Sequence, residues 1–151
     1  MPKKTIIVYL LLCVLPIQLW AVCNKSGVYK IGPGGTYTSL TAALNDLKST
    51  GAAGAVVFEL KSNYNASVET FPLTFNNIPC ISSTNTLTIR PEAGATGLIL
   101  QNNGTVINLN MSRFVMIDGR PGGTGTASEL QISGGANQPT ISFINDASNN
   151  F

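Results

Sequence analysis

The sequence predicts an all-β fold: a parallel solenoid with three strands per coil, preceded by an amphipathic capping helix. After Gly54, short apolar runs rich in Val, Ile, Thr and Phe follow one another and are separated by Gly, Asn or Pro. They form sets of three that recur at about 28 to 35 residues, a spacing typical of solenoid coils. A single helical pattern precedes them and no second one intervenes, which argues against a doubly wound α/β sheet.

Residues 1–21 are predicted to be a secretory signal peptide. Two lysines precede an apolar run of about 12 residues, and cleavage is expected after Ala21. An uncleaved membrane anchor is the alternative, but the run is shorter than the roughly 20 residues that span a bilayer. A lipoprotein signal is disfavoured because Val22 precedes Cys23. We therefore expect a secreted or cell-surface protein with no stable membrane span after cleavage.

Charge and composition narrow the functional classes. Without the signal, seven basic side chains face seven acidic ones, which argues against nucleic acid or a charged membrane surface as partner. Polarity comes from Asn, Thr, Ser and Gly, as is common around neutral sugars. The chain has no histidine, so His-based metal sites, Ser-His-Asp triads and Cys-His dyads are excluded within it. No cofactor and no metal are expected.

Residues 22–54 are predicted to form an N-terminal cap. Cys23 and Cys80 are an even pair in an exported protein, which predicts a disulfide, with two unpaired buried thiols as the alternative. Within the cap, "YKI" reads as a short strand and "GPGG" as a turn. A helix follows that Thr38 or Ser39 caps and Gly51 ends. Its apolar face contains Leu40, Ala43, Leu44 and Leu47.

Residues 55–151 are predicted to form the coils. Asn-rich corners between the strands fit sharp turns, because Asn tolerates left-handed backbone. An antiparallel β-sandwich is the competing architecture; the grouping of strands in threes and the leading helix favour the solenoid. The expected strands are residues 55–60, 72–75, 86–90, 97–101, 105–109, 114–118, 129–133 and 140–144.

Residues 27–151 resemble the entry to right-handed parallel β-helix proteins of the pectin-lyase-like group, pectinesterases included. The resemblance lies in Gly34-Gly35, the short helix, the strand Val56 to Leu60 and Tyr64, in this order. It is similar in particular to the N-terminal region of large secreted Bacteroidetes surface proteins. The resemblance implies a right-handed parallel β-helix of about two and a half coils, incomplete at the C-terminus. Catalytic coils, if the protein has them, would lie beyond residue 151. Because this fold hosts many activities, the resemblance transfers no catalytic residue.

Three charged residues are the candidates for a ligand site. Asp118 ends a predicted strand and Arg120 follows two residues later, a pair that suits a uronate or a calcium ion. Glu92 follows the strand one coil earlier, so the two carboxylates are expected to come near each other. The competing interpretation is that "DGRPGG" is only a turn and its acids are solvated corner residues.

The other acidic and aromatic residues suggest structural roles. Asp46, Glu59, Glu69 and Glu129 are scattered singly and are interpreted as solvated surface residues. Tyr29, Tyr37 and Tyr64 are expected to pack the cap against the first coil rather than to form a sugar-stacking platform.

Two functions remain open from the sequence. The first is a structural, adhesive or glycan-contacting scaffold with polysaccharide as its partner. The alternative is the start of a polysaccharide lyase or pectinesterase-like enzyme whose active face lies further along.

Overall fold

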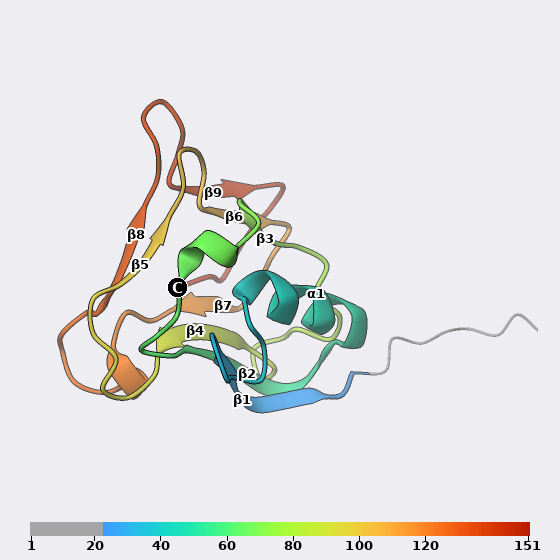
Figure 1. The fold of residues 1–151 in the computed structure, drawn as a ribbon. Coiled ribbons are helices and arrows are strands. Elements are labelled where there is room, and N and C mark those ends of the chain that lie inside the picture. The colour runs from blue at the N-terminus through green and yellow to red at the C-terminus, as the bar shows by residue number, and fades with distance from the viewer. Residues whose placement is uncertain (1–22) are drawn as a thin grey trace, which may run out of the picture.

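Residues 23–151, the part of the chain that the computed structural model describes, form three parallel β-sheets and one α-helix (Figure 1). The sheets have the strand orders β1-β2-β4-β7, β3-β6-β9 and β5-β8. They lie on three sides of a common core, and α1 packs beside β1, β2 and β3. The elements are β1 (Lys25–Ile31), α1 (Leu40–Thr50), β2 (Ala52–Leu60), η1 (Ala66–Val68), β3 (Leu73–Phe75), β4 (Leu87–Pro91), β5 (Leu98–Gln101), β6 (Ile107–Asn110), β7 (Val115–Ile117), η2 (Pro121–Gly123), β8 (Leu130–Ser133) and β9 (Ile141–Ile144).

The predicted signal peptide, residues 1–21, and its cleavage site lie outside the described residues. Within residues 23–151, no helix combines the length and the apolar character that crossing a membrane requires.

Each of the eight apolar runs predicted as strands overlaps a strand of the structure, so the predicted strand positions are confirmed to within a few residues. The strands pair in parallel with partners far along the chain, as Ile89 does with Ile117 and Ile107 with Ile141. All pairing between the strands of residues 23–151 is parallel, which excludes the antiparallel sandwich. Side chains alternate between core and surface along β4, β5 and β6, as period-2 strands with one solvated face do.

The predicted fold class, an all-β solenoid and right-handed parallel β-helix with three strands in each coil, is wrong in that form. The structure has three separate open sheets of four, three and two strands together with a helix. Between β1 and β2 the chain forms α1 instead of two strands, and between β2 and β3 it forms η1 instead of a strand. Because α1 buries four side chains in the shared core, the class is mixed: parallel sheets with one helix, roughly α/β-like.

Helix α1 has the boundaries that its sequence predicts. The Ser39 side chain accepts a hydrogen bond from the Ala42 N–H at 3.1 Å and so caps the first turn. Gly51 ends the helix with φ of 69°, and a Cβ there would lie 3.0 Å from both the Cys23 Sγ and Pro79. Glycine is therefore required at this position by both backbone and space. The buried face contains Leu40, Ala43, Leu44 and Leu47.

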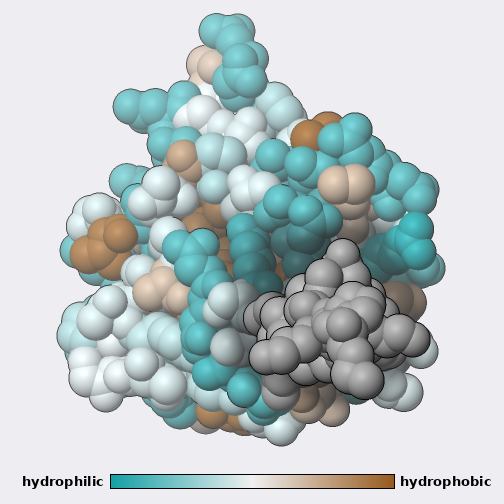
Figure 2. Space-filling view, turned by 90° about the vertical axis from the view of Figure 1, so that its right-hand side faces the viewer, coloured by the Kyte–Doolittle hydropathy of each residue, from teal (hydrophilic) through white to brown (hydrophobic). Residues whose placement is uncertain are grey.

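A disulfide between Cys23 and Cys80 closes the described N-terminus onto the loop before β4. The two Cα atoms are 6.2 Å apart and the residues are 57 positions apart in sequence. On the outer side of α1 the surface is mainly hydrophilic, with hydrophobic colour confined to separate small areas (Figure 2). The covalent link therefore adds to the hydrogen bonds by which Asn24, Lys25 and β1 join the end of α1 and β2.

We expect removal of the Cys23–Cys80 link to cost about 4 kcal/mol of unfolding free energy, because a loop of this length gains much entropy when the cross-link is absent. Urea unfolding of the Cys23→Ser/Cys80→Ser double variant measures this cost. Addition of reductant should destabilise the parent chain to the same extent and leave the double variant unchanged. Equal stability of both proteins would contradict a stabilising disulfide.

Candidate functional site

Charges of alternating sign form a row across the outer face of the four-stranded sheet. Lys30 of β1 is in register with Glu59 of β2, and Glu59 with Arg90 of β4. Asp118 comes level with Arg90, one step beyond the Ile89–Ile117 pair. The Lys30 Nζ lies 2.6 Å from the Glu59 Oε2, and the Arg90 guanidinium donates to the Glu59 Oε1 at 2.6 and 2.9 Å. The parallel register thus places opposite charges side by side on successive strands.

Glu59 is the centre of this row and is only 6% exposed. Burial alone would raise the pKa of its carboxyl, but hydrogen bonds from Lys30 and Arg90 outweigh burial and hold the pKa below its ordinary value. The prediction that Glu59 is a solvated surface residue is therefore wrong. Its carboxylate is a buried ion-pair partner shared by two cations.

The candidate ligand pair Asp118 and Arg120 is closed on itself. The Arg120 Nε and Nη2 donate to the two Asp118 carboxylate oxygens, each at 2.8 Å, and the Arg120 backbone N–H donates to Oδ1 at 3.0 Å. The hydrogen bond from the Arg120 side chain is the main reason that the pKa of Asp118 is lowered. Such a bidentate arrangement occupies the groups that a uronate or a calcium ion would need. This geometry fits a turn residue.

Glu92, the third candidate, has partners of its own. Its Oε1 accepts a hydrogen bond from the Ser62 backbone N–H at 2.8 Å, and its Oε2 lies 3.3 Å from the Lys30 Nζ. The bond from Ser62 is the main reason that the pKa of Glu92 is lowered. Glu92 and Asp118 thus follow neighbouring strands but are bound to different groups, and the structure does not assemble them into a two-carboxylate centre.

Glu69, which the sequence does not single out, holds the start of α1. Its carboxylate accepts hydrogen bonds from the backbone N–H groups of Leu40 and Thr41, both at 2.7 Å, and from the Thr41 hydroxyl at 2.6 Å. The Tyr64 hydroxyl donates to the same carboxylate at 2.7 Å. A negative charge is favourable at this end of a helix because the N–H groups there have no partner within the helix. The interpretation of Glu69 as a solvated residue is wrong.

The three tyrosines of the cap region do not form one platform. Tyr29 and Tyr37 pack with Phe58, with ring centroids 5.9 to 6.3 Å apart. The Tyr37 hydroxyl is hydrogen-bonded to Asp46, which also forms an ion pair with Lys25, so Asp46 is not a free solvated acid. Tyr64 is separate from this cluster and is 9% exposed.

Hollows in the surface gather around the two-stranded sheet β5-β8. Three of them, of about 540, 220 and 380 Å³, border its strands. Gln101 and Gln131 are exposed on its outer face, as is Ile99, which is 43% exposed. The polar side chains that line the three hollows are Ser62, Tyr64, Asn65, Ser67, Glu69, Thr96, Gln101, Asn102, Asn103, Ser128, Glu129, Gln131 and Ser133.

The β5–β8 surface, defined as the outer face of this sheet with its three hollows, has little free charge. Glu69 and Glu129 are its charged lining residues. Glu69 is bound to α1, and the Glu129 Oε2 accepts a hydrogen bond from the Gly97 N–H at 3.0 Å. The remaining polar groups are amides and hydroxyls, which donate and accept hydrogen bonds. Chemically, the surface suits a hydroxyl-rich ligand. Within residues 23–151, no group of three or more metal-binding side chains occurs.

Comparison of the chain with protein-family models, with curated proteins and with solved structures gave no match. The resemblance of residues 27–151 to the pectin-lyase-like group therefore stays a prediction.

We expect Glu59→Gln to lower the unfolding free energy at pH 7 by about 2–3 kcal/mol, because it leaves Arg90 and Lys30 without their shared buried partner. The folded-state pKa of Glu59 lies below the ordinary 4.5. The contribution of the Glu59 carboxylate to the free energy of unfolding is thus fully present above pH 4.5 and is lost as the pH falls through the folded-state pKa.

Denaturant unfolding from pH 3 to pH 7 tests both parts of this prediction, and Glu59→Gln should flatten the acid limb of the profile. The control is Asp146→Asn, which disrupts the exposed Arg113–Asp146 pair and should change stability by less than about 0.5 kcal/mol. Equal losses in the two variants would refute a special role for Glu59.

We expect Glu69→Ala to cost about 3 kcal/mol, since four hydrogen bonds to one carboxylate are lost. Glu129→Ala, which loses the hydrogen bond from the Gly97 N–H, should cost about 1 kcal/mol. Thermal and urea unfolding compare the two variants, and far-ultraviolet circular dichroism should show a partial loss of helix only in Glu69→Ala. A cost for Glu69→Ala no larger than that for Glu129→Ala would contradict this capping role.

Proposed function

We propose that the protein is a secreted or cell-surface scaffold that contacts glycan through its β5–β8 surface. One observation carries this proposal: three adjoining hollows follow one two-stranded sheet, and their polar lining is almost wholly amide and hydroxyl. Ligand sites are concave and contain a small number of oriented polar groups. Amides and hydroxyls offer paired donors and acceptors to sugar hydroxyls.

The register of the sheet supports this assignment. Ile99 pairs with Gln131 and Gln101 with Ser133, so these four outward side chains form two adjacent rows. Their inward neighbours Leu98 and Leu100 are buried in the core, which fixes the strand that presents the polar groups. Because these inward side chains hold β5 in place, we expect little ordering entropy to be lost when a ligand binds along it.

The alternative function is the start of a polysaccharide lyase or pectinesterase-like enzyme whose catalytic coils lie beyond residue 151. A carboxylate that acts as a base or a nucleophile must be free to reach the substrate. Asp118 is bound to Arg120, and Glu92 is bound to Ser62 and Lys30. We therefore propose no catalytic role for these residues.

The chain is expected to bind a subset of glycans on a glycan array, and Gln131→Ala should weaken that binding about fivefold, the effect of one lost hydrogen bond. Asp118→Asn, on the four-stranded sheet, is the matched control and should leave affinity unchanged. Biolayer interferometry with the retained glycans measures both variants, and thermal unfolding verifies their folds. The proposal fails if no glycan is retained, or if Asp118→Asn abolishes binding while Gln131→Ala does not.

A further inference from the structure

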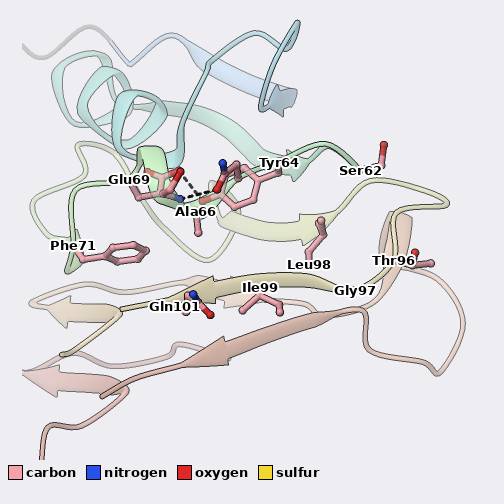
Figure 3. Close-up of a pocket in the computed structure, with 12 residues that line it drawn as sticks. Ser62, Tyr64, Ala66, Glu69, Phe71, Thr96, Gly97, Leu98, Ile99 and Gln101 are labelled. Atoms are coloured by element: carbon pink, nitrogen blue, oxygen red, sulfur yellow. Dashed lines mark hydrogen bonds between the residues drawn. The ribbon is translucent and has the colours of Figure 1, made fainter. Parts of the chain in front are cut away.

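The largest of the three hollows at the β5–β8 surface is a groove between η1 and the free edge of β5. Figure 3 shows Tyr64, Ala66 and Glu69 on the η1 side, and Leu98 and Ile99 along β5 on the other. The ring of Phe71 lies at one end of the groove near Gln101, and Ser62 and Thr96 lie at the other. Its volume of about 540 Å³ is within the range of about 300–1,000 Å³ that small-ligand sites occupy.

Backbone groups of β5 point into this groove. The N–H groups of Leu98 and Asn102 donate to carbonyls of the β8 segment at 2.9 and 3.1 Å. In a parallel pair, alternate residues bond to the same neighbour, so the N–H and C=O groups of Ile99 and Gln101 face away from β8. On that side the chain forms η1 rather than a strand. The edge of β5 therefore offers two donor–acceptor pairs to a ligand.

The width of the groove decides against a peptide strand as the ligand. Residues of η1 and β5 come within 8 Å of each other between Cα atoms. A strand inserted between them would require two strand spacings, about 9.6 Å in all. A sugar unit exchanges hydrogen bonds with the β5 edge alone and does not need a second strand spacing on the η1 side.

The apolar parts of the groove suit a sugar ring. Phe71 is half-buried and lines the groove, and aromatic rings present a broad apolar face. Tyr64 also lines it, but its hydroxyl is committed to Glu69, and burial raises the pKa of this hydroxyl, so it remains neutral. Apolar ring faces at one end and hydrogen-bonding groups along the edge match the two sides of a pyranose.

The charges around the groove select against acidic sugars. Glu69 is its charged lining residue, and Lys and Arg are absent from the lining. Glu129 lies close by, because its carboxylate is bound to the N–H of the groove residue Gly97. A uronate would thus meet carboxylates without a cation to pair with, and burying an unpaired charge is costly.

We propose that the η1–β5 groove is a subsite for an uncharged sugar unit whose ring stacks on Phe71 and whose hydroxyls exchange hydrogen bonds with the backbone of Ile99 and Gln101. This assignment rests on the proposed glycan contact and specifies its ligand class. It reverses the electrostatic expectation from Asp118 and Arg120, which suited a uronate.

Calorimetry of the full-length chain with neutral hexasaccharides (cellohexaose, mannohexaose and any neutral glycan retained on the array) and with hexagalacturonate tests the subsite. Neutral binding should exceed uronate binding by at least about tenfold, corresponding to one unpaired charge. Phe71→Leu, which keeps an apolar side chain at this position, should weaken neutral binding about fivefold, and Phe71→Tyr should restore it.

Ile99→Pro provides a second test, because it removes an N–H that faces the groove and spares the ladder to β8. It should weaken neutral binding about fivefold, while the control Ile99→Ala, which keeps that N–H, should not. Two results would overturn the subsite but not the proposed glycan scaffold. In both, binding is weakened by Gln131→Ala; in the first the chain prefers hexagalacturonate, and in the second neither Phe71→Leu nor Ile99→Pro changes the affinity. Binding of no glycan at all would remove both proposals.

Discussion

The carboxylate of Glu69 is the interaction on which the arrangement of η1, α1 and the groove depends. It accepts hydrogen bonds from the first turn of α1 and from Tyr64, so one side chain joins the helix to the segment that precedes β3. Without this joint, the N–H groups of Leu40 and Thr41 would lack their carboxylate partner, and the hydrogen bond from the Thr70 N–H to the Thr41 hydroxyl would have to hold the η1 segment to the helix. The position of the wall beside β5 in turn creates the groove. A structural cap and a ligand surface are therefore two results of the same contact.

A second electrostatic feature, the row through Glu59, acts on a different sheet. Its members come from β1, β2, β4 and the residue after β7, so it links strands that are distant in sequence. Because Glu59 is buried and its cations are partly exposed, the row combines the cost of burying a charge with strong local pairing. The register of the four-stranded sheet thus brings its charges together in pairs, whereas amides and hydroxyls make up most of the polar lining on β5 and β8.

Much of the local structure could be predicted from the sequence, because it depends on nearby residues. The helix limits follow from Ser39 and Gly51, and the strand positions follow from short apolar runs between turn residues. The fold class was predicted incorrectly because the spacing of three strands per coil was extended to the segments before β3, where the chain forms α1 and η1. The polar stretch after Leu60 turns at Asn65 and forms η1, where three strands per coil would have required a strand.

The site was harder to predict, because its contacts join residues about 30 positions apart. Nothing near Glu69 in sequence reveals that it caps a helix that begins at Leu40. The Glu59 row did leave a signal: when "VYKI", "VFEL", "TIRP" and "MIDG" are superposed, Lys30, Glu59, Arg90 and Asp118 fall in one column with alternating charge. No sequence signal points to the free edge of β5. That edge is free because the segment Ala66–Val68 beside it forms η1 and not a strand.

The parallel register also has a consequence for how the chain acquires its structure. Adjacent strands within each sheet are separated by other elements, so no hairpin can form early and serve as a local nucleus. Each pairing instead closes a loop of about 30 residues before any contact compensates for the lost chain entropy. Such a topology has a high contact order and folds slowly compared with helical proteins of the same size. Helix α1, held by local bonds, is the natural place for order to begin.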